Sequence, residues 1–235
     1  MSTFATLREG SLHAALKARY AATVDAPQIE VDVDGFVIDV ASADGLIEIQ
    51  TGSFASARRK LERLVGSHRV LLVYPILVEK WLVVVDAGGA IVRRRRSPRR
   101  GLGLDLFDEL VHLPTLIAHP NFRIELPLVC VEEIRGPIPP RARYRYPREW
   151  WRLDRRLIEV GETLHVDTPA DLLGLLPAGL PGEFTTADVV ARSGCSKRLA
   201  MRAVYCLERS GAVVRLRRHG RLMLYGRARN GGGPA

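Results

Sequence analysis

The sequence predicts an α/β protein built in two parts. Its first half alternates segments of helical and strand-like periodicity in the order α-β-β-β-α-β. A stretch rich in proline and arginine, residues 136–152, follows and is typical of a linker. Three helical segments and a hairpin come after it. These observations predict an α/β domain over residues 1–135, a smaller domain over residues 153–230 and a disordered tail at 231–235.

The first elements follow from side-chain spacing. Leu12, Leu16 and Tyr20 recur every four residues, which predicts a helix over Ser11–Ala22. Three short apolar segments follow and predict a meander of strands with the sequences IEVDV, FVIDV and LIEIQT. They are separated by two Asp-Gly dipeptides, which favour tight hairpin turns.

The rest of the first part is predicted in the same way. The segment SFASARRKLERLV, which begins at Ser53, has the spacing of a second helix. Arg69–Ile76 is a nearly continuous apolar run, typical of a strand covered on both faces, and EKWLVVVD supplies another strand. Arg93–Gly101 is then predicted to be a basic loop that either clamps a phosphate backbone or is simply solvated. One or two further helices, within LDLFDELVHLPTLIAHPNF, close the domain.

Charge is distributed unevenly along the 235-residue chain. The formal net charge is +9, yet residues 1–90 carry nine Lys/Arg against eleven Asp/Glu, so the surplus belongs to the remainder. This pattern favours a polyanionic partner. The three cysteines lack metal-ligand spacing, which argues against a disulfide framework and a zinc site. The chain shows no signal-peptide pattern and no apolar run of membrane-spanning length, which predicts a cytoplasmic protein with no membrane contact.

Two acidic residues interrupt apolar strands of the meander, Asp39 in FVIDV and Glu48 in LIEIQT. Period-two alternation places Gln50 on the same face as Glu48. Because the two strands are joined by a tight turn, their carboxylates can come close together and repel unless a cation lies between them. The cation expected there is a hard divalent ion, Mg²⁺ or Mn²⁺. In the alternative interpretation, Asp39 caps a strand end and Glu48 faces solvent.

With an acid on the second strand and Glu48-Ile49-Gln50 on the third, this element order resembles the PD-(D/E)XK nuclease superfamily, the restriction-endonuclease-like fold. The resemblance covers roughly residues 8–86. It implies that Asp39 and Glu48 bind the metal and that Gln50 positions the attacking water. The family usually carries lysine at the third position, so a neutral Gln50 orients water without contributing a full charge.

Two further positions follow from the same resemblance. In some members the lysine lies on the following helix, which makes Lys60 a candidate, although ARRK on a helix is more often a solvated face. Many members also carry a glutamate on the first helix. Glu9, just before the predicted helix, is the candidate for that role, and His13 lies within the helix.

The C-terminal part resembles a winged helix-turn-helix. Thr185 and Thr186 cap a short helix, Ser193-Gly194 turns the chain, a second helix starts at Ser196, and a hairpin wing follows. Residues 185–229 contain eleven basic and two acidic residues. The resemblance implies that the second helix enters the major groove of double-stranded DNA while the wing holds phosphates. The expected DNA-binding residues are Lys197, Arg198, Arg202, Arg217, Arg218 and Arg221. A winged helix used only for protein contacts is the alternative.

Together these features predict a magnesium- or manganese-dependent DNA endonuclease of a repair or defence system, with Asp39, Glu48, Gln50 and Glu9 as its catalytic residues. The alternative is a catalytically inactive, nuclease-like protein that binds DNA as a regulator. Gln50 favours the inactive protein, and the Asp39/Glu48 pair favours the enzyme. A nucleotide-processing enzyme is disfavoured because the chain has no glycine-rich phosphate loop. The sequence leaves open whether the chain is a monomer or a homodimer.

Overall fold

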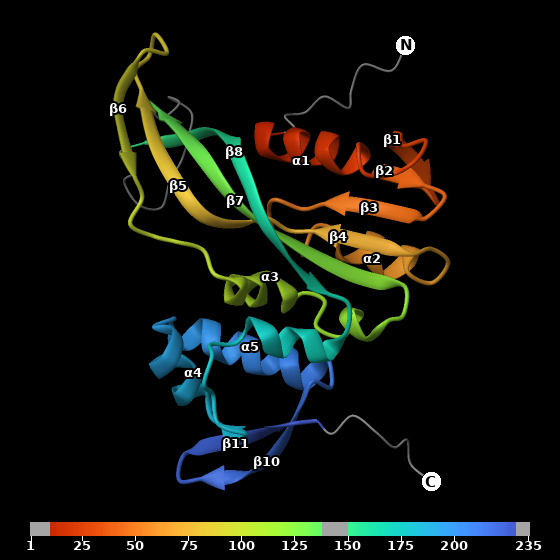
Figure 1. Cartoon of the computed structure of the whole chain (residues 1–235), viewed down its shortest axis with the longest axis vertical. Helices are drawn as coiled ribbons and strands as arrows, with labels where there is room; N and C mark the ends of the chain where they lie inside the picture. The colour runs from red at the N-terminus through yellow and green to blue at the C-terminus, as the bar shows by residue number, and fades with distance from the viewer. Residues whose placement is uncertain (1–9, 138–149, 229–235) are drawn as a thin grey trace.

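A computed structural model describes residues 10–137 and 150–228, except for the side chain of His219. Glu9, the interior of the predicted linker and the predicted tail lie outside these residues. The protein is of the α/β class: a large mixed sheet carries helices on both faces, and a helical unit with a small sheet lies below it (Figure 1). Within the described residues, no helix has the length and apolar character needed to span a bilayer.

The strands fall into two sheets. The large sheet has the order β1-β2-β3-β4-β7-β5-β6, with β8 paired to β7, and the small sheet has the order β10-β11-β9. The strands are β1 Gln28–Val33, β2 Phe36–Ser42, β3 Gly45–Ile49, β4 Val70–Val73, β5 Ile76–Val85, β6 Ile91–Arg96, β7 Phe122–Gly136, β8 Trp151–Val166, β9 Glu183–Phe184, β10 Val213–His219 and β11 Leu222–Arg227.

The helices are short and mostly cover the large sheet or build the C-terminal unit. The α-helices are α1 Ser11–Ala21, α2 Arg58–Leu64, α3 Phe107–Leu110, α4 Thr186–Ser193 and α5 Lys197–Arg209. The 3-10 helices are η1 Gly103–Leu106, η2 Leu116–Ala118 and η3 Pro169–Leu175. The first six elements therefore follow the order α1-β1-β2-β3-α2-β4 that the sequence predicts.

The turns of the meander follow from their residues. Asp34 and Gly35 both have positive φ, 53° and 81°, which a two-residue hairpin requires and which Asp and Gly tolerate. Gly45 begins β3 with φ 142°, and a Cβ there would lie 2.6 Å from the backbone oxygen of Arg69. Glycine thus allows β3 to lie close beside the start of β4, with which it pairs in parallel.

The domain boundary differs from the one the sequence predicts. β8 pairs antiparallel with β7 from Ile124↔Val166 to Gly136↔Trp151, so residues 151–166 belong to the large sheet rather than to a linker or to the C-terminal unit. The prolines and arginines before Trp151 predicted an extended linker. The pairing of β8 with β7 is a tertiary contact that this local composition does not indicate. The C-terminal unit therefore begins after Val166.

The basic segment after β5 also differs from expectation. Arg93–Gly101 was predicted to be a loop, but its first four residues continue strand β6, which pairs with β5 from Trp81↔Arg96 to Val85↔Ile91. A run of arginines does not have the apolar alternation that predicts a strand. Contacts of Arg94 and Arg96 with residues of β5 and β7 hold β6 on the sheet.

The C-terminal unit contains the helices and hairpin that the sequence predicts. Thr185 caps α4 in a capping box with Asp188, and Ser196 caps α5. Gly194 ends α4 with φ 67°, the left-handed conformation common after helices. β10 and β11 form the hairpin, and β9 adds a third strand through Tyr225↔Phe184.

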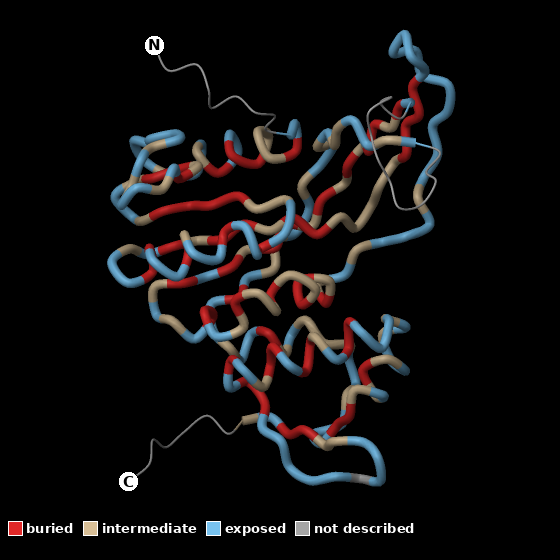
Figure 2. Tube along the Cα trace, turned by 180° about the vertical axis from the view of Figure 1, so that it is seen from behind, coloured by how far each residue is buried: buried red, intermediate tan, exposed pale blue. Residues whose placement is uncertain are grey.

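Hydrophobic side chains connect the two parts. Leu12, Leu16 and Tyr20 of α1 pack on one face of the large sheet. The main cluster occupies the opposite face beneath α2, continues through α3 and reaches α5, with Phe107 among its fully buried side chains. Figure 2 shows this buried material running through both parts of the protein. The C-terminal unit therefore packs against α3 through a shared hydrophobic core and is not connected to the large sheet by a linker alone.

Candidate functional site

Asp39 and Glu48 lie on neighbouring antiparallel strands. The β2–β3 pairing runs from Ser42↔Gly45 to Val40↔Ile47, so Asp39 and Glu48 are the residues that directly adjoin its last pair. Asp39 reaches across to β3, where its Oδ2 accepts a hydrogen bond of 2.8 Å from the backbone N–H of Ile49.

Lys60 of α2 completes the pair from one side of the sheet. Its Nζ lies 2.5 Å from Glu48 Oε2 and also 2.5 Å from the backbone oxygen of Val37 on β2. Both ionised side chains are largely buried, with Glu48 only 9% exposed as a residue. The Lys60 ammonium therefore bridges the two strands that carry the carboxylates. This is the helix position that the nuclease resemblance makes a candidate for the missing lysine.

His13 of α1 approaches from the other side. Its Nε2 lies 3.2 Å from Asp39 Oδ2. Sequence reasoning chose Glu9 for the helix position and passed over His13, although His13 directly follows Leu12 of the buried stripe and so stands at the edge of the face that α1 turns toward the sheet. The cluster thus consists of two carboxylates, one ammonium group and one imidazole.

The two carboxylates have opposite pKa shifts. Burial alone would raise the pKa of Asp39, but hydrogen bonds from His13 and Ile49, together with the charge on Lys60, hold the pKa below its ordinary value. For Glu48, burial raises the pKa, Lys60 opposes the rise and the charge of Asp39 adds to it, so the pKa lies above its ordinary value. Asp39 is therefore the more firmly ionised of the two.

This difference predicts a pH dependence of stability. A carboxylate with a depressed folded-state pKa contributes stability above its unfolded pKa, and that contribution is lost as the pH falls through the folded value. The gap in unfolding free energy between the wild type and Asp39→Asn should thus be largest near neutral pH and shrink below the ordinary pKa of 3.8. Urea denaturation from pH 7 down to pH 3 measures it. A gap that stays constant across this range would contradict the prediction.

Gln50 is hydrogen-bonded to the loop that leads to α2. Its Nε2 donates to Ser53 O at 3.3 Å and to Ser56 Oγ at 3.4 Å, in the loop that leads to α2. The amide therefore bonds to the loop, whereas Lys60 contacts the Glu48 carboxylate. Glu9, the other predicted catalytic residue, lies outside the described residues.

The donor set fits a hard divalent cation. The described residues contain no group of three or more His, Cys, Asp or Glu side chains that could hold a metal ion. Mg²⁺, however, is usually bound by only one or two carboxylates and completes its octahedron with waters and substrate phosphates. Asp39 and Glu48 are the carboxylates of this cluster that such an ion would bind, and both are balanced in this structure by His13 and Lys60 respectively.

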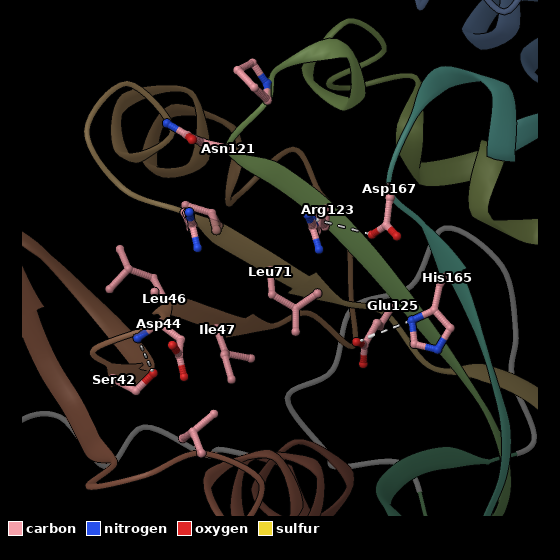
Figure 3. A pocket seen from close by; sticks show the side chains of 15 residues that line it. Ser42, Asp44, Leu46, Ile47, Leu71, Asn121, Arg123, Glu125, His165 and Asp167 are labelled. Atoms are coloured by element: carbon pink, nitrogen blue, oxygen red, sulfur yellow. Dashed lines mark hydrogen bonds and ion pairs between the residues drawn. The ribbon is translucent and has the colours of Figure 1, made fainter.

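A pocket of about 680 Å³ lies elsewhere on the sheet, at the amino ends of β3, β4 and β7 (Figure 3). Four of its side chains form two contacts: Arg123 lies 3.7 Å from Asp167, and His165 lies 3.5 Å from Glu125. None of the predicted site residues lines it. Glu48, in contrast, lies near the carboxyl end of β3, and the carboxyl ends of strands are where open α/β sheets usually bind ligands.

The predicted DNA-binding residues of α5 divide into two groups. Lys197 and Arg198 are exposed at the start of the helix, and Arg198 Nη2 also lies 4.0 Å from Asp108 Oδ1. Arg202 instead turns toward α3, where its Nη1 donates to Asp108 Oδ1 at 2.8 Å and to Asp108 O at 2.9 Å. Arg202 therefore joins the C-terminal unit to the rest of the protein. The sequence around Arg202 does not predict this contact, because Asp108 is 94 residues away.

Two apolar side chains share the exposed face of α5. Met201 is 55% exposed and Tyr205 is 45% exposed, and both line a shallow depression together with Lys197 and Arg198. Met201 and Tyr205 follow Lys197 at successive intervals of four residues, which places all three on one face of the helix. On the hairpin, Arg218 and Arg221 are exposed, while Arg217 forms an ion pair of 2.7 Å with Glu183.

Comparison with known proteins gives two matches. The chain is 29% identical over 226 residues, 95% of its own length and 87% of the relative's, to an "Uncharacterized protein" of Treponema pallidum (strain Nichols). No solved structure matches it. A family described as "Domain of unknown function (DUF8091)" matches residues 10–167, a range that ends just after β8 closes the large sheet. Because this match covers more than half of the sequence, the chain belongs to the DUF8091 family.

Proposed function

We propose that the protein is a metal-dependent DNA endonuclease of the PD-(D/E)XK type. The observation that carries the proposal is the contact of Lys60 with Glu48 beside Asp39. It occurs within the element order α-β-β-β-α-β, with the acids on the second and third strands and the lysine on the following helix. The resemblance noted from the sequence concerns this same combination of residues and elements.

The roles of the side chains follow from their charges and contacts. Bound Mg²⁺ would neutralise phosphoryl oxygens and lower the pKa of a coordinated water. Asp39, oriented by the Ile49 N–H and by His13, supplies one firmly ionised ligand, and Glu48 supplies the second. Lys60 holds a full positive charge where a phosphodiester develops negative charge during attack, which a neutral amide such as Gln50 does not provide. His13 is an additional proton carrier next to Asp39.

The C-terminal unit supports duplex DNA as the substrate. We propose a winged helix-turn-helix over residues 168–228, formed by α4, α5 and the β10–β11 hairpin. Lys197 and Arg198 with Met201 and Tyr205 form the exposed face of the helix expected to enter the major groove. Arg217, Arg218 and Arg221 lie on the hairpin expected to contact phosphates.

A cleavage assay tests this function. Supercoiled plasmid and linear duplex DNA are incubated with the full chain and Mg²⁺ or Mn²⁺, with and without chelator. Nicking or cleavage that needs the metal and disappears in Asp39→Asn supports the endonuclease. Binding of DNA without cleavage under every metal condition instead supports the second candidate, an inactive DNA-binding relative. That candidate is favoured by the amide of Gln50, which is turned toward Ser53 and Ser56.

The hairpin makes a measurable contribution to affinity. Each phosphate contact on duplex DNA lowers the slope of log K against log salt by about 0.9. Replacing Arg217, Arg218 and Arg221 together with glutamine is therefore expected to make that slope shallower by about two to three units. Fluorescence anisotropy with a labelled duplex at several salt concentrations measures the slope.

A charge-matched control separates local contacts from net charge. It replaces three exposed arginines on α1 and at the amino edge of the large sheet with glutamine, namely Arg19, Arg69 and Arg123. The control variant should change the slope by less than one unit. Equal changes in both triple variants would show that the hairpin has no specific role.

A further inference from the structure

Strand β6 carries four consecutive arginines whose two faces differ in chemistry. On one face, Arg94 Nε lies 3.0 Å from Glu132 Oε1, and its guanidinium stacks 4.0 Å above the centroid of the Trp81 ring. On the same face, Arg96 forms an ion pair with Glu79. These arginines are neutralised by acids of β5 and β7, and they hold β6 on the sheet.

On the other face of β6, the arginines have no acidic partners among the described residues. Arg93 and Arg95 pair across from Val84 and Leu82 of β5 and are exposed. Neither forms an ion pair with any residue of the described chain, in contrast to Arg94 and Arg96. Two residues along a strand are about 6.8 Å apart and point the same way, so the two guanidinium groups form a short row of unpaired charge. Figure 2 shows that β6 is exposed, whereas the neighbouring end of β5 is buried.

The same face continues across β5, β7 and β8 onto a buried carboxylate. Glu133 is only 4% exposed and is surrounded by three cations. Its oxygens lie 3.3 Å from Lys80 Nζ, 2.5 Å from Arg135 Nη2 and 3.3 Å from Arg155 Nε. One carboxylate cannot balance three cations, so the cluster keeps a positive excess although its centre is buried.

Arg152 adds to this excess. It pairs across from Arg135 in the β7–β8 register and is exposed. Burial and the charge of Arg152 both lower the pKa of Arg155, against the opposing effect of Glu133. The cations of this face therefore repel one another, and a polyanion would relieve the repulsion.

We infer that this surface, here called the basic face, binds the phosphate backbone of duplex DNA as a second contact surface, separate from the C-terminal hairpin. It consists of Lys80, Arg93, Arg95, Arg135, Arg152 and Arg155. The choice of DNA rests on the proposed function. The surface spans four strands in the order β6-β5-β7-β8 (Figure 1).

The size of the basic face favours a polymer over a small ion. Neighbouring strands are about 4.8 Å apart, so its outer rows are about 14 Å apart. A single phosphate is too small to contact all of them, whereas a DNA strand carries one charge for every 3.4 Å along the helix axis. Because Glu133 orients the inner cations and Arg93 and Arg95 stand at the outer edge, the surface presents several separate phosphate contacts.

The test compares two variants of one strand. Arg93→Gln with Arg95→Gln removes two charges from the basic face, and Arg94→Gln with Arg96→Gln removes two charges from its other side. Duplex DNA binding by the full chain is measured by anisotropy between 50 and 200 mM salt, a range over which phosphate contacts dominate the change in affinity. The first variant is expected to make the salt slope shallower by about two units and to weaken binding at low salt about tenfold. The second variant should change the slope by less than one unit.

The outcomes separate this inference from the proposed function. Equal slope changes in both variants, or no change in the Arg93/Arg95 variant, would overturn the inference even if the wild type cleaves DNA. If the wild type binds but never cleaves, a slope change confined to the Arg93/Arg95 variant still supports the inference while the endonuclease proposal fails. Absence of any duplex binding by the wild type at 50 mM salt overturns the inference. Circular dichroism melting of both variants confirms that they are folded before binding is compared.

Discussion

Replacing Glu48 with glutamine is expected to lower Mg²⁺-dependent cleavage of duplex DNA by a factor on the order of a hundred to a thousand. The substitution keeps the size of the side chain but removes the charge of the carboxylate that contacts Lys60 and that, in the proposed function, binds the metal. Because cation binding and the placement of the Lys60 ammonium both depend on this carboxylate, the loss should appear mainly in kcat/KM at saturating metal. Initial rates with a fluorescent duplex measure it, and isothermal calorimetry with Mn²⁺ should show weakened binding.

Two control variants sharpen this test. Glu62→Gln removes a carboxylate from the exposed Arg58–Glu62 pair on α2, the same helix that carries Lys60, and should leave the rate nearly unchanged. Gln50→Ala should reduce the rate by less than about tenfold, because its amide is hydrogen-bonded to the Ser53–Ser56 loop and contributes no full charge. Wild-type activity in Glu48→Gln would contradict the catalytic assignment. Equal losses in Gln50→Ala and Glu48→Gln would return Gln50 to the role inferred from the sequence.

Replacing Phe107 with alanine is expected to lower the free energy of unfolding by about 3–5 kcal/mol. Phe107 is 0% exposed and lies on α3, in the cluster that links the large sheet with α5. The substitution leaves a cavity that this tightly packed junction cannot close completely, so transfer and cavity contributions add. Urea denaturation monitored by circular dichroism measures the change.

Leu102 provides the matched control because it lies in the same segment but is 50% exposed. Leu102→Ala should change the free energy of unfolding by less than about 0.5 kcal/mol. A loss below about 1 kcal/mol in Phe107→Ala would mean that the junction contributes little and that the two parts are held together by polar contacts such as Arg202–Asp108.

Substitutions in the Glu48–Lys60 pair are also expected to lower the stability of the fold. Removing one partner of a buried ion pair leaves an uncompensated charge, which is strongly destabilising. Variants at Glu48 and Lys60 should therefore be checked for folding before any rate is interpreted. Glu48→Gln is preferred to Glu48→Ala because the amide can still accept a hydrogen bond from Lys60.

Local sequence patterns determined most of the individual elements. The stripe of Leu12, Leu16 and Tyr20 predicted α1, and the two Asp-Gly dipeptides predicted the hairpins of the meander. Thr185 and Ser196 correctly predicted the starts of α4 and α5. These features depend on interactions within a few residues, namely caps, turns and the side-chain period, so they can be read without knowledge of the fold.

Only the tertiary structure decided which strands pair and which distant side chains contact each other. β8 pairs with β7, strand β6 forms from arginines, and Arg202 bonds to Asp108 at a separation of 94 residues. In the candidate site, the sequence predicted the Asp39/Glu48 pair because a tight turn connects their strands. The sequence assigned the third position to Gln50 and kept Lys60 only as a candidate, because the contact of Lys60 with Glu48 depends on how α2 packs over β3. It also could not reveal that Glu133 gathers three cations from three strands, since long-range packing and charge balance act between residues that no local pattern connects.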